Sequence, residues 1–221
     1  MKRIALAIAL LFVRIPFSHA AVADDDADAD TCDDVRTCAA GCEKGDGDDC
    51  FDTGTMYYDG GDDGSTADPK KARAYFEKAC TLGEMDGCLE AGLLYEEPAA
   101  GVDLPRAITL YQKACYAGDA TACTYLGVML HAGKGAAKDV DRALTLFRGA
   151  CARAEGAACT AIGHLYETGD GLKKDAGLAL EFYKRGCESD DDDGCAAAKR
   201  LAPAPSKKPE AKKPQGARPT R

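Results

Sequence analysis

The sequence lacks asparagine, has only three histidines and contains no long apolar run. A helix that crosses a bilayer needs about 20 apolar residues, whereas the apolar run at residues 4–13 has ten. We therefore expect no membrane insertion. A metal-dependent hydrolase needs clustered histidines, but His19, His131 and His164 are scattered along the chain. We accordingly expect no metal ion and no cofactor.

The N-terminal residues 1–23 have the pattern of a cleaved signal peptide. Lys2 and Arg3 precede the apolar run, and small residues follow it, with cleavage expected after Ala20 or Ala23. We expect the mature protein to be exported and soluble, either in the periplasm or outside the cell. The sequence does not separate these two destinations.

Charge is strongly segregated along the chain. Residues 1–20 and 202–221 are basic, so the formal net charge of −9 understates how acidic the residues between them are. An acidic surface repels nucleic acid, and we expect no nucleic-acid partner. We assign residues 24–38 as an acidic segment that contains cysteine, and residues 202–221 as a disordered tail rich in lysine and proline.

Ten of the twelve cysteines recur as C-x7-C pairs, which is typical of a stacked structural repeat. The first members of successive pairs are 38, 35, 36 and 36 residues apart. Structural zinc sites need closer spacing, about two to four residues, so an exported chain favours six disulfides over zinc. The expected pairs are Cys42–Cys50, Cys80–Cys88, Cys115–Cys123, Cys151–Cys159, Cys187–Cys195 and, outside the repeat rhythm, Cys32–Cys38.

Apolar residues at helical spacing flank each pair, so each unit is expected to be helix, loop, helix. Aromatic residues lie four positions before the first cysteine: Phe76, Tyr111, Phe147 and Tyr183. Glycine recurs four positions after the second cysteine: Gly54, Gly92, Gly127 and Gly163. Three more positions on are Tyr57, Tyr95, Leu130 and Tyr166. Glycine destabilises a helix relative to alanine, so its recurrence at equivalent positions needs a physical reason. We predict that a neighbouring helix approaches closely at each glycine and that the large aromatic residues fill the space next to this contact.

The paired cysteines must lie on opposite sides of a turn. Residues eight apart in one helix are separated by about 12 Å along its axis, whereas bridged Cα atoms are roughly 4.4–6.8 Å apart. A disulfide must therefore join the end of one helix to the start of the next. Glycines such as Gly83 and Gly118 allow the chain to reverse between the cysteines, and Asp68, Asp103 and Asp139 are expected helix N-caps.

The second unit resembles the Sel-1-like repeat, a relative of the tetratricopeptide repeat. The resemblance rests on Lys71-Ala72, Ala79-Cys80, Gly83, Gly87-Cys88, Ala91-Gly92 and Tyr95, and it recurs over residues 39–200. The version with bridged cysteines resembles the secreted Helicobacter cysteine-rich proteins. The resemblance implies an all-α, right-handed α/α solenoid of four to five repeats over residues 39–201, with a concave face that binds partners. Two departures are Leu130, in place of tyrosine, and Arg153-Ala154-Glu155, in place of the turn glycine.

The same resemblance implies an alternative function, because cysteine-rich members are described as penicillin-binding proteins or weak β-lactamases. A serine β-lactamase needs the pattern S-x-x-K, and none of the four serines has lysine three positions later. We therefore expect no catalytic residues. A binder of β-lactams or peptidoglycan fragments with weak hydrolase activity stays as the alternative.

A second helical stripe lies one, five and eight residues past the second cysteine of each pair, and two interpretations of it remain open. It lines a peptide groove, or it packs against the second helix of its own unit. For the groove, the candidate contacts are Phe51, Tyr58, Leu93, His131 and His164.

The interpretation that follows is an exported, disulfide-stapled scaffold, expected to be a monomer. It binds a protein, a peptide or a cell-wall fragment through a concave groove. A redox-active thiol pair at Cys32 and Cys38 is the remaining alternative to a structural bridge there.

Overall fold

The computed structural model describes residues 32–60 and 66–203. The expected signal peptide 1–23, most of the acidic segment 24–38 and nearly all of the expected tail 202–221 lie outside these residues. Within them the chain forms ten α-helices and no strand. No helix among them has the length and apolar character needed to cross a membrane.

The helices alternate between two classes, here called odd and even by their number. The odd helices are α1 (Val35–Lys44), α3 (Pro69–Leu82), α5 (Leu104–Ala117), α7 (Val140–Cys151) and α9 (Ala176–Glu188). The even helices are α2 (Gly47–Asp59), α4 (Met85–Leu94), α6 (Ala120–Ala132), α8 (Gly156–Thr168) and α10 (Asp192–Leu201).

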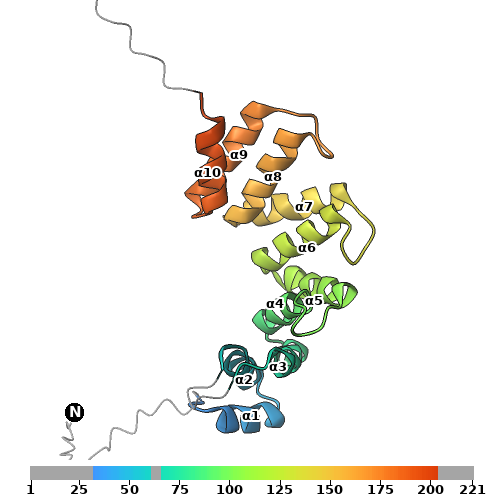
Figure 1. The fold of residues 1–221 in the computed structure, drawn as a ribbon, viewed down its shortest axis with the longest axis vertical. Coiled ribbons are helices and arrows are strands. Elements are labelled where there is room, and N and C mark those ends of the chain that lie inside the picture. Colours follow the sequence, from blue (N-terminus) through green and yellow to red (C-terminus); the bar gives the residue numbers. More distant parts are fainter. Residues whose placement is uncertain (1–31, 61–65, 204–221) are drawn as a thin grey trace, which may run out of the picture. The chain divides into compact units, whose positions relative to one another are not determined.

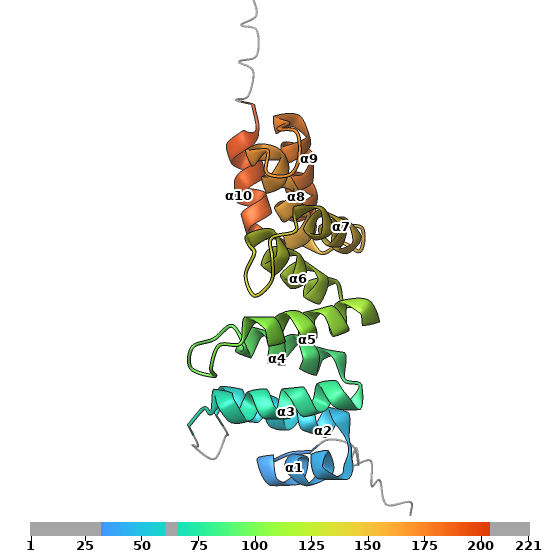
Figure 2. The ribbon, with the colours of Figure 1, turned by 90° about the vertical axis from the view of Figure 1, so that its right-hand side faces the viewer.

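Each helix packs mainly against its neighbours in the sequence, as Figures 1 and 2 show. Beyond these neighbours, α8 also contacts α6 and α10. Such near-neighbour packing defines a solenoid, in which stability is the sum of repeats and the interfaces between them. The expected α/α solenoid is therefore confirmed.

Aspartate caps most of the described helices, in keeping with the absence of asparagine. The side chains of Asp68, Asp103 and Asp139 accept hydrogen bonds from backbone amides in the first turns of α3, α5 and α7. An N-cap of this kind stabilises a helix by about 1 kcal/mol. These three predicted caps are confirmed.

A disulfide spans every turn from an odd helix to the next even helix. The first cysteine lies near the end of the odd helix and the second near the start of the even helix, with the two Cα atoms 4.4–4.8 Å apart. The five bridges are Cys42–Cys50, Cys80–Cys88, Cys115–Cys123, Cys151–Cys159 and Cys187–Cys195. These are the pairs that the repeat spacing predicts.

The turns from an even helix to the following odd helix have no disulfide and are closed by a repeated backbone hydrogen bond. The amide of the N-cap aspartate donates to the carbonyl oxygen seven residues past the second cysteine. The four bonds are Asp68 N to Tyr57 O (2.7 Å), Asp103 N to Tyr95 O (2.9 Å), Asp139 N to Leu130 O (2.9 Å) and Asp175 N to Tyr166 O (2.9 Å). Turns spanned by a disulfide therefore alternate along the chain with turns closed by a hydrogen bond.

The recurrent glycines lie against the recurrent aromatic rings. A Cβ atom placed on Gly54, Gly92, Gly127 or Gly163 would lie 2.5–2.7 Å from the ring of Phe76, Tyr111, Phe147 or Tyr183, respectively. All four aromatic side chains are at most 3 % exposed. Each even helix thus meets the following odd helix at a glycine, as the sequence predicts, because no larger residue leaves room for the ring.

The turns after α7 and α9 lack the glycine found after α3 and α5. Gly83 and Gly118 end α3 and α5 in the left-handed region, with φ of 109° and 110°. At the corresponding positions after α7 and α9, Ala154 and Asp190 take positive φ values of 63° and 60°. The turn at Ala154 illustrates the cost. A side chain in this region costs roughly 1–2 kcal/mol. The disulfide Cys151–Cys159 spans this strained turn and holds it closed.

Candidate binding face

The tyrosines seven residues past the second cysteine pack on neighbouring odd helices. Tyr57 stacks on Tyr75 of α3, with ring centroids 5.5 Å apart, and Tyr166 stacks on Phe182 of α9 at 5.7 Å. These two join an even helix to the odd helix that follows it. Tyr95 instead donates a hydrogen bond to Glu77 (3.0 Å) on α3, the odd helix that precedes α4.

The side chains one residue past the second cysteine face the interior of the repeat. Phe51 lies beside Phe76, with ring centroids 5.3 Å apart, and Leu89 packs on the core. Thr124 is 7 % exposed, and Thr160 donates a hydrogen bond to Asp191 (2.6 Å). At this position the structure supports packing over groove contact, including for the candidate Phe51.

The side chains eight residues past the second cysteine mostly bond within the protein. Glu96 and Glu167 accept hydrogen bonds from the hydroxyls of Tyr111 (2.8 Å) and Tyr183 (2.6 Å). His131 Nε2 lies 2.9 Å from Asp170 Oδ2, in the loop that follows α8. The fourth member, Tyr58, is 44 % exposed.

These contacts reveal a pairing that the sequence already contains. Where the buried aromatic residue is tyrosine, glutamate stands eight residues past the second cysteine and accepts its hydroxyl hydrogen bond. Where the buried residue is Phe76 or Phe147, the position is Tyr58 or His131. A buried hydroxyl without a hydrogen-bond partner costs about 1–3 kcal/mol. The glutamates occur with the tyrosines because they supply this partner.

The residues two and five positions past the second cysteine form an accessible row on the even helices. None of the ten is buried. We call this row the even-helix face. It consists of Asp52 and Thr55 on α2, Glu90 and Leu93 on α4, Tyr125 and Val128 on α6, Ala161 and His164 on α8, and Ala197 and Arg200 on α10.

Of the groove candidates, Leu93 and His164 belong to this face, whereas the positions of Asp52, Glu90 and Tyr125 were missed. The sequence pattern placed the stripe at positions one, five and eight past the second cysteine. In the structure the exposed row is at positions two and five, so position one was one residue too early. In a helix each residue turns the direction of the side chain by about 100°. That difference separates a side chain in the core from one in solvent.

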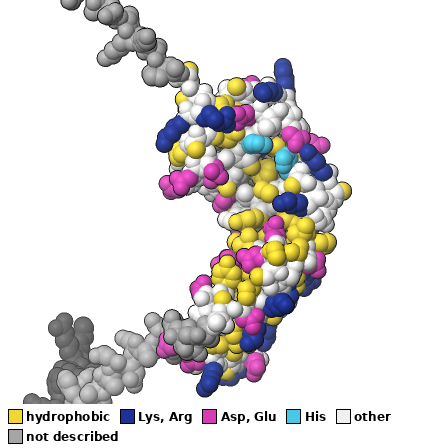
Figure 3. Space-filling model, in the orientation of Figure 1, with side chains coloured by type: hydrophobic (Ala, Val, Ile, Leu, Met, Phe, Trp, Pro, Cys, Tyr) yellow, Lys and Arg dark blue, Asp and Glu magenta, His cyan; other side chains and the backbone are white. Residues whose placement is uncertain are grey.

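The middle of the even-helix face is apolar. Tyr125 is 37 % and Val128 46 % exposed, one turn apart on α6, and Leu93 on α4 is half-buried. The ring of Tyr125 stacks on buried Tyr111, with centroids 5.4 Å apart, which holds the ring in place. In Figure 3 hydrophobic side chains gather around α6, with acidic side chains nearby.

The α2 and α4 part of the face is acidic. Burial raises the pKa of Asp52, and the negative charges of Asp49, Asp48 and Asp46 raise it further. Burial, followed by the charge of Asp86, raises the pKa of Glu90. Among the ion pairs formed by the described residues, none includes Asp52 or Glu90. A cation placed here would relieve the repulsion between these carboxylates.

A hollow of about 420 Å³ lies between α8 and α10. Its lining includes Ala157, Ala161 and Ala197, which are too small to fill it. His164 and Arg200 also line it, and the ring of Tyr183 contributes to its wall. The hollow can accommodate part of an extended chain.

A charged network holds the edge of this hollow. Arg200 donates two hydrogen bonds to Glu167, at 2.6 and 2.7 Å, and Tyr183 donates a third. The hydrogen bonds from Arg200 and Tyr183 lower the pKa of Glu167 to about 2. Burial and the same carboxylate raise the pKa of Tyr183. Arg200 therefore joins α10 to α8 while remaining open to solvent.

We expect Glu167→Gln to change the acid stability of the protein. Because the folded pKa of Glu167 is below its ordinary value of 4.5, the carboxylate stabilises the fold above that pH. This stabilisation is lost as the pH falls toward 2. The difference in melting temperature between wild type and Glu167→Gln should be largest at neutral pH and shrink through this window. The control is Glu181→Gln, an exposed side chain on α9; an equal trend in the control would contradict the assignment.

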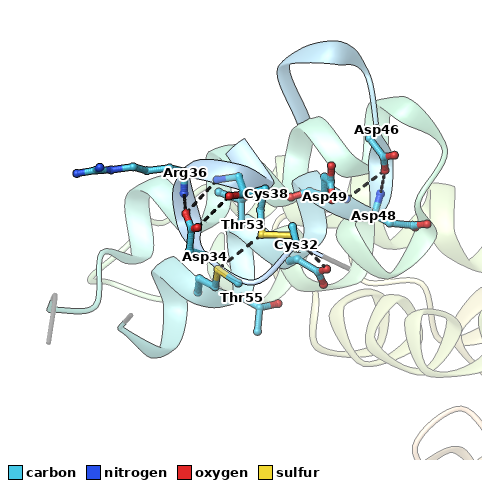
Figure 4. Close-up of a disulfide and its surroundings, with 12 residues drawn as sticks. Cys32, Asp34, Arg36, Cys38, Asp46, Asp48, Asp49, Thr53 and Thr55 are labelled. Atoms are coloured by element: carbon cyan, nitrogen blue, oxygen red, sulfur yellow. Dashed lines mark hydrogen bonds between the residues drawn. A yellow bond between two sulfur atoms is a disulfide. The ribbon is translucent and has the colours of Figure 1, made fainter. Parts of the chain in front are cut away.

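Cys32 and Cys38 form the sixth disulfide, with Cα atoms 5.0 Å apart. Cys38 is buried and its sulfur lies 3.9 Å from that of Met56 on α2. Figure 4 shows the bridge beside Asp34, which caps α1 through the amides of Arg36 (2.7 Å) and Thr37 (3.1 Å). The bridge therefore attaches the residues before α1 to the first repeat. Among the described residues, no cluster of three or more histidine, cysteine or acidic side chains is arranged to hold a metal ion.

Comparison with known families decides what the repeat is. The Sel1 repeat model matches four times, at residues 48–84, 86–119, 120–154 and 156–191, and so covers more than half of the chain. The chain is a Sel1 repeat protein. Each Sel1 repeat is one even helix followed by one odd helix, so three disulfides bridge successive repeats: Cys80–Cys88, Cys115–Cys123 and Cys151–Cys159. The helices α1 and α10 flank the four matched repeats.

Similar proteins include several with Sel1-type folds. A protective antigen of uropathogenic Escherichia coli strains, described as displaying an SLR fold, is 26 % identical with a TM-score of 0.66; the match covers 73 % of this chain and 34 % of that one. Cysteine rich protein B of Helicobacter pylori is 28 % identical over 59 % of this chain and 94 % of that one, with a TM-score of 0.47. Cytochrome c oxidase assembly factor 7 of Xenopus tropicalis is 30 % identical over 106 residues, 47 % of this chain and 46 % of that protein. The chain thus spans about half the length of this curated relative.

Proposed function

We propose that this Sel1 repeat protein is an exported scaffold that binds an extended protein or peptide segment along its even-helix face. Sel1 repeats generally mediate protein interactions. The observation that carries the proposal is the even-helix face itself, which presents two accessible side chains on each even helix at the same positions. Repeats that offer equivalent positions at regular intervals suit an extended ligand.

The centre of the face supplies the expected anchor. Tyr125 and Val128 expose apolar area side by side on α6, and Tyr125 rests on a buried ring. Rigid aromatic side chains contribute most of the binding energy in many interfaces, because they lose little entropy on binding. The Xenopus tropicalis relative is named as an assembly factor, which is consistent with a role in bringing proteins together.

Export is supported by cysteine chemistry. Six disulfides in one chain are typical of oxidising compartments, since thiols stay reduced in the cytosol. The expected signal peptide agrees with this. The mature protein should begin at Ala21 or Asp24 and be recovered from the periplasm or the medium; an intact Met1 on protein from the cytosol would contradict export.

Site-specific photo-crosslinking tests the binding face in living cells. A photoreactive residue in place of Val128 should give discrete adducts with partner proteins. The matched control replaces Leu178 on α9, which is also exposed at 36 % but lies on an odd helix. Equal adducts at both positions, or none at position 128, would contradict the proposal. Turnover of a chromogenic cephalosporin by the purified protein would instead support the hydrolase alternative.

A further inference from the structure

We propose that the protein's own C-terminal segment, residues 204–221, docks on the even-helix face and competes there with other ligands. This inference rests on the proposed function, because it assigns an occupant to the same surface. The segment lies outside the described residues. The proposal rests on the sequence of the segment, on its attachment just beyond α10 and on the chemistry of the face.

The charges of the segment and the face are complementary. The segment contains six lysine and arginine residues and one glutamate. At the other end of the face, Asp52 and Glu90 take part in none of the ion pairs of the described residues. Burial, and after it the charge of neighbouring acidic groups, raises the pKa of both carboxylates. Binding a cation would stabilise their charged forms. The two partners therefore attract each other over a distance of about one Debye length, or 8 Å, at physiological salt.

The apolar part of the face suits the prolines of the segment. Prolines at positions 205, 209, 214 and 219 alternate with the basic residues. Proline-rich segments favour the extended polyproline II conformation and bind grooves lined by aromatic rings. The face offers the exposed ring of Tyr125 beside Val128 and, toward the C-terminus, the alanine-lined hollow between α8 and α10. Proline and alkyl stems of lysine would cover this area.

The segment is long enough to follow the face. It continues just beyond Leu201, the last residue of α10, which is itself an even helix. Helix α10 contacts α8, and α8 contacts α6. Packed helices lie about 8–10 Å apart, so α6 is roughly 20 Å from α10. Eighteen residues in polyproline II conformation span about 56 Å at roughly 3.1 Å per residue, which leaves length to reach the carboxylates of α4.

The lysine pairs define where charges should meet. Lys207-Lys208 follows α10 closely in the sequence, whereas Lys212-Lys213 would lie about 30 Å along an extended segment. Continued beyond α6, such a segment would bring this second pair toward Glu90 on α4. Glu90 and Lys212-Lys213 are therefore the charges to exchange in a test.

Binding of the free segment to a shortened chain tests the proposal. A chain that ends at Pro203 is titrated with a fluorescent peptide of residues 204–221. We expect saturable binding that weakens as salt rises. Glu90→Lys should weaken it by about tenfold or more, whereas Glu181→Lys on α9 should change it less than about twofold. A peptide carrying Lys212→Glu and Lys213→Glu should recover binding to Glu90→Lys but not to Glu181→Lys.

The full-length chain provides the second arm. Its attached segment competes at an effective concentration in the millimolar range, so the full-length chain should bind the added peptide about tenfold or more weakly than the shortened one. Absence of saturable binding, equal loss in the two lysine variants, or equal affinity of full-length and shortened chains would each overturn the inference. If the photo-crosslinked adducts at position 128 are still observed after such a result, the face binds another ligand and only the assignment of the C-terminal segment fails. If those adducts are absent as well, the proposed function fails too.

Discussion

Full reduction of the disulfides is expected to unfold the repeats. A solenoid has no single large core, so its stability depends on each junction between neighbours. In the chain-entropy model, a bridge that closes a loop as short as C-x7-C stabilises the fold by roughly 2.5 kcal/mol. The total stability of a natural domain is only about 5–15 kcal/mol. Losing several such bridges together therefore exceeds what the remaining contacts can offset.

Removal of a single bridge tests this prediction quantitatively. Replacing both Cys115 and Cys123 by alanine removes the bridge between α5 and α6 without leaving a free thiol. We expect the free energy of unfolding to fall by about 2–3 kcal/mol, measured by urea denaturation. Removing Cys32–Cys38, which closes a loop of similar length outside the repeats, is the comparison and should cost a similar amount in the same model. Unchanged stability after full reduction would contradict the structural role of the bridges.

The second large effect is expected from Gly127→Ala. The added Cβ would lie 2.6 Å from the ring of Phe147, which is only 2 % exposed. Overpacking of this kind costs about 1–3 kcal/mol, more than the gain of up to about 1 kcal/mol from replacing glycine in a helix. Thermal denaturation should therefore show net destabilisation.

Gly149→Ala is the matched control for this prediction. Gly149 also lies within a helix, α7, but a Cβ there would meet no atom within 4 Å. The substitution should stabilise the protein by about 0.5–1 kcal/mol. In the Gly127→Ala background, Phe147→Leu should cost less than in the wild type, because a smaller side chain relieves the clash. Equal effects of the two alanine substitutions would show that the glycine–aromatic contact is unimportant.

Much of the fold could be predicted because the relevant signals repeat. The cysteine period placed the turns, and the requirement that bridged Cα atoms approach within a few ångströms excluded a single helix. The glycine and aromatic positions predicted the close approach of Gly127 and its equivalents to buried rings, and the structure shows this contact. Each of these inferences concerns neighbours in the sequence, which are also neighbours in a solenoid.

The binding face was harder to predict, because periodicity gives the spacing of a stripe but not its absolute direction. Position one past the second cysteine was left open between groove contact and packing, and the structure shows Phe51 and Leu89 packed inward. The glutamate–tyrosine pairing was visible in the sequence but not used. By contrast, the contact of His131 with Asp170 joins a residue of α6 to a loop residue 39 positions away, and no local pattern specifies the conformation of that loop.

Peptide mapping of the non-reduced protein tests the central claim most directly. The account predicts six linked pairs: Cys32–Cys38, Cys42–Cys50, Cys80–Cys88, Cys115–Cys123, Cys151–Cys159 and Cys187–Cys195. Free thiols at the helix turns, or bridges between cysteines of distant repeats, would contradict it.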